Sequence, residues 1–349
     1  MAEYKVDEIL KNTIIESKLI TQDEKRKLLS RLREEKLINT RKNSKKIIGI
    51  DCSNLDKEND KILKILNNID KDGIQNTIER WEYDRNYKYS AIWKYDNLSI
   101  DKLHELISEE KAVEFESNFD YLSSIYHVPT VLKLNNEYVF KFSKIIKDNS
   151  DTLEVKYPAL VIFYTDINII EIRVSSLNSN FKTNNDIYAK EIDQISSWIK
   201  SYLKVNLSEI NFEKIINNII EKDNQTEIYS RWINSHLGGY ARLKVPEDNR
   251  YILPLIGELE SLIESHIELF NSNLEIKGLL DDFIEKIKED REYPRSAICW
   301  KNDDNTADYI IEFIHNYKGR NYTVLSHYYN NNDLEMMNDV TRNIIHYNE

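Results

Sequence analysis

The stretch that most constrains the fold is residues 151–177, DTLEVKYPALVIFYTDINIIEIRVSSL, which holds two long apolar runs joined by a short polar link. Residues 160–164 and 169–174 are rich in β-branched and aromatic side chains, which favour strands. The link contains three turn-forming residues, Thr165, Asp166 and Asn168. The pattern predicts an antiparallel β-hairpin at the centre of a sheet.

A second hairpin is predicted just before the first. Residues 131–134 and 138–142 are strand-like, two asparagines lie between them, and apolar and polar positions alternate in EYVFKF. The two hairpins together give four successive antiparallel strands, which is about the minimum for a stable sheet. Because successive side chains of a strand point to opposite faces, Glu171 and Arg173 share the polar face of the last strand. We therefore expect one face of the sheet to be open to solvent or to a partner.

The chain as a whole is expected to be α+β, with an antiparallel sheet domain followed by a mainly helical domain. Its 349 residues exceed what one core usually supports, and its 5 prolines and 7 glycines are too few for long flexible linkers. From residue 187 the apolar period becomes that of an amphipathic helix, and residues 227–235 also have a helical pattern. We predict a basic helical arm at 1–50, an α+β sheet domain at 51–182, and a mainly helical domain with a C-terminal strand–helix unit at 183–349.

An internal repeat is a further hypothesis. DRNYKYSAIWK at residues 84–94 has a near copy, DREYPRSAICWK, at residues 290–301. Each copy is followed by a polar turn and a predicted helix, at residues 100–107 and 307–314. A structural repeat would give two copies of a helix–strand–helix unit. The alternative is that each copy is a surface turn followed by an ordinary buried strand.

The N-terminal arm is strongly basic. Residues 25–46 contain ten basic and two acidic residues, a net charge of +8, which leaves −20 for the rest of a chain of net charge −12. A helix opened by the capping box Thr21 and Glu24 is followed by basic turn residues between two short strand-like pieces, an order that resembles the last helix and wing of a winged helix. The expected phosphate contacts are Arg31, Arg33, Arg41, Lys42, Lys45 and Lys46.

Two other interpretations of this arm stay open. There is room for only two helices before the wing-like turn, so a plain helical hairpin with solvated lysines fits the pattern equally well. The basic face could also dock on the acidic remainder of the chain or on an acidic protein partner. Nucleic acid and an acidic protein are therefore the two kinds of partner that the sequence indicates.

A metal-dependent nuclease of the PD-(D/E)xK type is the alternative function. Such a site needs carboxylates that hold Mg²⁺ and a lysine on a neighbouring position of the sheet. Glu154 and Lys156 form a Glu-x-Lys tripeptide with Glu137 upstream on the preceding hairpin. Glu171 and Arg173 form a second candidate, with Asp166 upstream and arginine in place of lysine.

Other functional classes lack their motifs. The 2 cysteines and 7 scattered histidines form no recognisable zinc pattern, and phosphate-loop, dinucleotide and nucleophile-elbow motifs are absent from the sequence. The N-terminal residues have no secretory apolar region and no apolar run approaches about 20 residues, so we expect a cytoplasmic protein without a membrane span. The sequence favours a non-enzymatic intracellular binding or regulatory protein, with no metal or cofactor.

Overall fold

The computed structural model describes residues 5–348 apart from 42–48, 69–72, 97, 99, 116–121, 135, 183, 224–225, 235–239, 244–255, 290–293, 301–308 and 329–333. The chain divides into two compact units. Unit 1 comprises Met1–Ile210, Lys318–Val324 and Asn330–Asn343, and unit 2 comprises Asn211–Tyr317, Leu325–Tyr329 and Ile344–Glu349. Helices and mainly antiparallel strands occur in both, so the α+β class is confirmed. The boundaries expected at residues 50 and 182 stay predictions.

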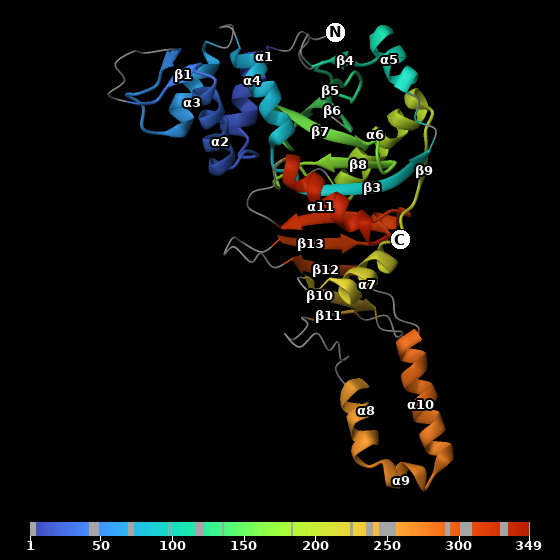
Figure 1. The fold of residues 1–349 in the computed structure, drawn as a ribbon. Coiled ribbons are helices and arrows are strands. Elements are labelled where there is room, and N and C mark those ends of the chain that lie inside the picture. The colour runs from blue at the N-terminus through green and yellow to red at the C-terminus, as the bar shows by residue number, and fades with distance from the viewer. Residues whose placement is uncertain are drawn as a thin grey trace. The chain divides into compact units, whose positions relative to one another are not determined.

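Unit 1 contains a mainly antiparallel run of neighbouring strands (Figure 1). Their order is β3 (Tyr89–Asp96), β8 (Ile169–Val174), β7 (Glu154–Tyr164), β6 (Glu137–Lys147), β5 (Thr130–Leu134) and β4 (Val113–Glu114). Only the pairing of β4 with β5 is parallel among those described here, and the short strand β9 (Asn206–Ser208) pairs with β3.

Both predicted hairpins are present in unit 1. Strands β7 and β8 pair antiparallel with Phe163 opposite Ile170, and β5 and β6 pair antiparallel with Val131 opposite Phe140. The link between β7 and β8 turns at Asn168, whose φ is 54°. Asparagine tolerates this left-handed conformation better than most residues, which is why it suits the turn. The strong apolar runs therefore formed the strands that their side chains favour.

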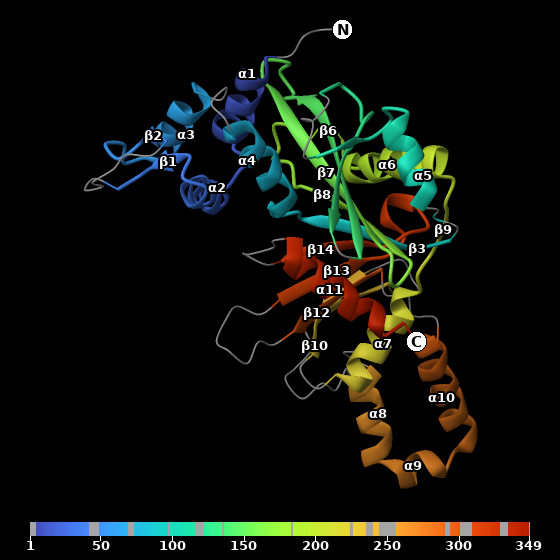
Figure 2. The same ribbon diagram turned by 45° about the horizontal axis from the view of Figure 1, so that its top comes forward.

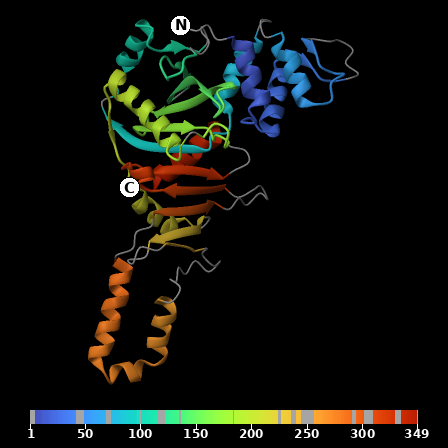
Figure 3. The same ribbon diagram turned by 180° about the vertical axis from the view of Figure 1, so that it is seen from behind.

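Both faces of β8 are covered, so the expected open face is wrong for this strand. Every residue of β8 is buried. Helix α6 (Ile187–Leu203) packs on one face of the strands and α11 (Leu334–His346) lies on the other, as the opposite views in Figures 1 and 3 show. Helix α5 (Ile100–Ser108) packs beside α6. The alternation of β8 reflects an apolar face under α6 and a polar face under α11.

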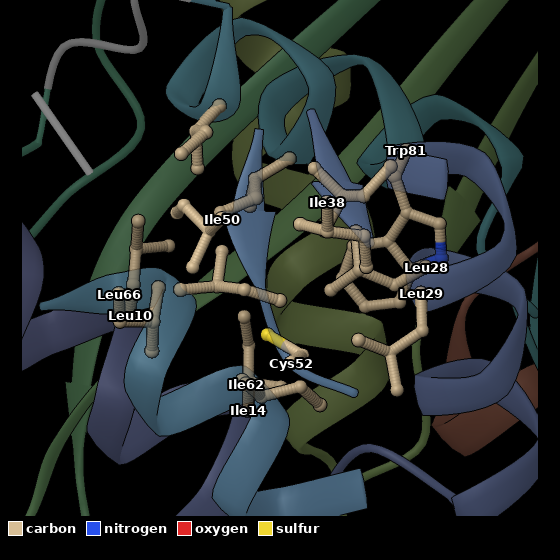
Figure 4. Packing of buried hydrophobic residues seen from close by; sticks show 14 of the residues in the cluster. Leu10, Ile14, Leu28, Leu29, Ile38, Ile50, Cys52, Ile62, Leu66 and Trp81 are labelled. Carbon is tan, nitrogen blue, oxygen red and sulfur yellow. The ribbon is translucent and has the colours of Figure 1, made fainter. Parts of the chain in front are cut away.

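The N-terminal residues of unit 1 form a helical cluster with its own core (Figures 2 and 4). Its elements are α1 (Val6–Lys11), the π-helix η1 (Asn12–Glu16), α2 (Gln22–Glu34), β1 (Ile38–Asn39), β2 (Ile50–Asp51), α3 (Glu58–Leu66), α4 (Ile74–Trp81) and the 3-10 helix η2 (Glu82–Asp84). The predicted capping box is confirmed, since Thr21 and Glu24 exchange hydrogen bonds at 3.2 and 2.8 Å. Leu28, Leu29 and Leu32 of α2 are buried in this core, which continues through Trp81.

The structure does not confirm a wing after α2. Ile38 lies opposite Ile50 in a parallel pairing of β1 with β2, whereas the two strands of a hairpin wing run antiparallel. Residues 42–48, which join these strands, lie outside the described residues.

Gly49 occupies a position that requires glycine. Its φ is +74°, and a Cβ atom built on it would lie 2.0 Å from the carbonyl oxygen of Leu37. Replacing Gly49 by alanine should therefore destabilise the N-terminal core by about 2 kcal/mol or more, through both backbone strain and this clash. Urea unfolding measures the loss, and Gly278→Ala is the matched control because nothing lies within 4 Å of a Cβ atom there. Equal stability of the two variants would contradict the assignment.

Unit 2 contains helices and a second run of strands. Its strand order is β11 (Tyr240–Leu243), β10 (Thr226–Asn234), β12 (Arg295–Trp300), β13 (Tyr309–Ile314) and β14 (Val324–Tyr328). The helices of this part of the chain are α7 (Phe212–Lys222), α8 (Ile256–Ser265), α9 (Ile267–Asn271) and α10 (Leu274–Glu289), and the short 3-10 helix η3 (Tyr317–Gly319) lies near a boundary.

The helix predicted at residues 227–235 is wrong. Its described residues, 227–234, belong to strand β10, which pairs antiparallel with β11 and β12. Its isoleucine, tyrosine and tryptophan residues suit a strand as well as a helix. Hydrogen bonding to two neighbouring strands favours the strand over the helix. The second half of the chain consequently contains more strand than the expected mainly helical domain.

The predicted internal repeat is not matched by the elements that follow its two copies. The two Ser-Ala-Ile segments lie in strands β3 and β12, as expected. The next described element after the first is α5, but after the second it is β13, which takes up the described residues, 309–314, of the helix predicted at 307–314. Because their following elements differ, the two stretches share a buried strand and not a complete helix–strand–helix unit.

Candidate functional site

A buried polar network joins β8 to α11 in unit 1. Glu171 and Arg173 are each 0% exposed, and Arg173 Nη2 lies 2.7 Å from Glu171 Oε2. Tyr164 and Thr341 both donate hydroxyl hydrogen bonds of 2.9 Å to the same carboxylate oxygen. Arg173 also donates to Asn338 Oδ1 at 2.8 Å. We call these five residues the α11 network.

Three donors of the α11 network, from Arg173, Tyr164 and Thr341, converge on one carboxylate oxygen of Glu171. Burial raises the pKa of the Tyr164 hydroxyl well above its usual value, and the nearby Glu171 carboxylate raises it further. The tyrosine therefore stays a neutral hydrogen-bond donor to Glu171 at physiological pH. A buried carboxylate needs such donors and a cationic partner to compensate for lost hydration. These contacts make Glu171 a link between strand and helix.

Two further candidate carboxylates lie next to this network. Arg342 of α11 bonds Glu137 Oε1 at 3.0 Å and Asp166 Oδ2 at 2.6 Å, and Asn338 donates to Glu137 Oε2 at 2.7 Å. The hydrogen bond from Arg342 lowers the pKa of Asp166. Because this folded-state pKa is depressed, the pair stabilises the fold at neutral pH and loses that contribution as the pH falls through the lowered pKa.

The structure thus brings together four of the six residues proposed for the nuclease. Glu137, Asp166, Glu171 and Arg173 all lie where β6, β7 and β8 meet α11. The carboxylates of Glu137, Asp166 and Glu171 accept hydrogen bonds from guanidinium, amide or hydroxyl groups. In the described part of the chain, no three His, Cys, Asp or Glu residues are grouped so that they could hold a metal ion.

The other two nuclease candidates, Glu154 and Lys156, have different partners. Glu154 pairs near the surface with Lys147 at 3.2 Å. Lys156, only 1% exposed, binds Glu79 at 2.8 Å and Glu82 at 2.7 Å. The glutamate and the lysine of a Glu-x-Lys tripeptide point to the same side of a strand. Their surroundings differ here, because Lys156 meets the buried glutamates of α4 and η2, whereas Glu154 pairs with the exposed Lys147.

Lys141 completes a buried lysine–glutamate tetrad with Lys156, Glu79 and Glu82. Lys141 Nζ lies 2.5 Å from Glu79 Oε2 and 2.9 Å from Glu82 Oε2, and its side chain is 0% exposed. The strands β6 and β7 supply the two lysines, while α4 and η2 supply the two glutamates. Sequence reasoning missed this tetrad. A lysine in the apolar strand EYVFKF was a signal, but nothing local identified the glutamates of a distant helix as its partners.

The predicted phosphate contacts differ in their surroundings. Arg31 forms an ion pair with Asp84 and lies 3.6 Å from Glu35, so its charge is engaged within unit 1. Arg33 is exposed and donates to Ser30, and Arg41 is exposed. Lys42, Lys45 and Lys46 lie outside the described residues. Lys25 is buried, and desolvation lowers its pKa, so it does not contribute to a basic surface.

A basic hollow of ≈ 460 Å³ lies on the N-terminal helical cluster. It is lined by residues of α2 and α3 together with one residue after β1: Arg26, Lys27, Leu29, Ser30, Arg33, Thr40, Glu58 and Lys61. Four of these side chains are cationic and two carry hydroxyl groups. Arg26 forms ion pairs with Asp23 and Glu58, with nitrogen–oxygen distances of 3.1 and 3.4 Å. Of the predicted contacts that the structure describes, Arg31, Arg33 and Arg41, only Arg33 lines this hollow.

Comparison with known proteins found no relative of this chain. No protein-family model matches the chain, and no curated protein matches it in sequence. None of the helices in the described part of the chain combines the length and the apolarity that crossing a bilayer requires.

Proposed function

We propose that this chain is a binding protein whose own side chains perform no catalysis. The observation that carries this proposal is that the buried candidate catalytic groups are held in ion pairs. Glu171 is bound by Arg173, and Lys156 is bound by Glu79 and Glu82. A general base or metal ligand must offer a lone pair to its substrate or ion. Freeing these groups would break buried ion pairs, at a cost of about 3–5 kcal/mol.

We further propose that the basic hollow contacts nucleic acid. Lys27, Arg33 and Lys61 offer cations, and Ser30 and Thr40 offer hydroxyl groups, which are the donors that commonly bind phosphate oxygens. These cations come from two helices, so their charges converge on one concave surface. Such contacts read the backbone and not the bases, so the binding would be largely independent of sequence.

Charge reversal at the hollow tests this proposal. Replacing Lys27, Arg33 and Lys61 by glutamate should weaken the binding of duplex DNA by about tenfold or more at low salt. The slope of log Kd against log salt should decrease by about one for each phosphate that the variant no longer neutralises. Fluorescence anisotropy of a labelled duplex measures both quantities. The matched control reverses three exposed lysines elsewhere, Lys94, Lys200 and Lys222, and should bind nearly as the parent does.

Two results would contradict the proposed function. Absence of DNA and RNA binding by the parent at low salt would leave an acidic protein or internal docking as the role of the basic residues. Metal-dependent cleavage of DNA or RNA that is lost in Glu154→Ala would instead establish the nuclease. Glu154 is suited to this test because its ion pair with Lys147 is partly exposed, and its loss leaves both buried networks in place.

A further inference from the structure

The segment from α8 to α10 exposes an unusual amount of apolar side chain. Of the twelve large hydrophobic side chains exposed among the described residues, seven belong to it. They are 40–73% exposed and comprise Leu262, Ile267, Leu269, Leu274, Ile276, Leu279 and Phe283. Soluble proteins seldom leave so many large apolar side chains together in water unless they form an interaction surface.

The apolar residues follow helical spacing on α10. Ile276, Leu279 and Phe283 are separated by three and four positions, so they lie along one side of the helix. Helices α8 and α10 are joined through α9 and stand apart from each other in all three views (Figures 1, 2 and 3). The exposed fractions of 67% for Leu279 and 54% for Phe283 show that this side of α10 is uncovered by the described residues.

The charge of the segment restricts what can cover it. Residues 259–285 contain seven acidic residues and one lysine, a net charge of −6. The lysine, Lys277, donates to Asn271 at 3.1 Å. Glu275 and Asp282 lie four residues before and three residues after Leu279, so they border the apolar stripe. A partner helix with basic residues beside its own apolar stripe would match this surface.

We propose that the α8–α10 segment binds a basic amphipathic helix of a partner protein. A second copy of this chain fits less well, because two such segments would bring net charges of −6 against each other. This inference concerns a different surface and a different class of partner from the nucleic-acid proposal. Variants of the segment leave the basic hollow unchanged, so each proposal can fail without the other.

The test uses the full chain and two designed peptides of about 18 residues, long enough to form a helix on binding. One carries leucines at helical spacing with lysines between them, and the other carries glutamates in place of the lysines. Isothermal titration should show binding of the lysine peptide that weakens with added salt, and binding of the glutamate peptide at least about tenfold weaker. A lysine peptide with its leucines scrambled should also bind poorly, since it has no apolar stripe.

Substitutions in α10 locate the binding surface. The double change Leu279→Glu and Phe283→Glu should weaken binding of the lysine peptide by about tenfold or more, because it places charge in the apolar stripe. Ile125→Glu, at an apolar residue of unit 1 that is 54% exposed, is the matched control and should bind normally. Replacing Glu275 and Asp282 by lysine should reverse the preference toward the glutamate peptide. Because all four substituted residues of α10 are exposed, circular dichroism should be unchanged.

Three outcomes would overturn the proposal. Equal affinity for the lysine and glutamate peptides would show that charge does not select the partner. Unchanged affinity of the double variant would place the contact elsewhere. Sedimentation of the parent as a dimer, with the double variant as a monomer, would identify a second copy as the occupant.

Discussion

Replacing Lys156 by methionine is expected to destabilise unit 1 by about 3–5 kcal/mol. The change removes one of two cations from the buried tetrad and leaves Glu79 and Glu82 to share Lys141. Glu79 and Glu82 are 3% and 1% exposed, so water cannot compensate for the missing cation. A buried charge left without its partner is costly even where the intact pair adds little to stability.

Urea unfolding followed by circular dichroism measures this loss, and the same strands offer a matched control. Lys147 and Glu154 also join β6 to β7, at 3.2 Å, but their side chains are 52% and 36% exposed. Lys147→Met should therefore have little effect, because a solvated and screened ion pair contributes little to stability. A similar small effect for Lys156→Met would show that the tetrad is not a buried charge cluster in solution.

Replacing Arg173 by methionine is expected to cause a loss of similar size and to loosen α11. Glu171 would keep hydrogen bonds from Tyr164 and Thr341 but would lose its cation while 0% exposed. Asn338 of α11 would lose a hydrogen bond at the same time. The expected loss is about 3–5 kcal/mol in urea unfolding, together with faster proteolysis within α11.

Two further variants test the cause of this effect. Adding Glu171→Gln to Arg173→Met should recover part of the loss, because the remaining buried group is then neutral. Arg342→Met should cost less, about 1–2 kcal/mol, because Arg342 and its partner Asp166 are 30% and 36% exposed, and its second partner Glu137, 12% exposed, keeps a hydrogen bond from Asn338. If Arg173→Met were no more harmful than Arg342→Met, the α11 network would not hold the helix to the sheet.

The strongest local patterns predicted the elements correctly. The apolar runs at 160–164 and 169–174 became β7 and β8, and the capping box at Thr21 began α2. These features depend on neighbouring residues, namely a turn that favours a hairpin and a side chain that caps its own helix. They could therefore be inferred without knowledge of the rest of the fold.

The wrong predictions were made where the apolar residues fitted both the spacing of a helix and that of a strand. Residues 227–235 and 307–314 have apolar spacings that suit a short helix, yet the described parts of both are strands. Each of these strands pairs with β12, which is distant in sequence from 227–235. Pairing with another strand supplies hydrogen bonds and packing that intrinsic preference cannot reveal, and for β10 one of the partners is remote in the chain.

For the candidate site, the sequence by itself determined which chemical groups lie on the central strands, and the alternation of β8 placed Glu171 and Arg173 on one face. Only the tertiary structure decided what those groups contact. Asn338 and Thr341 reach them from a helix about 170 residues away, while Glu79 approaches Lys156 from 77 residues earlier. Burial then decides their role, because charged groups removed from water must bind one another, and local sequence does not specify which distant segment excludes the water.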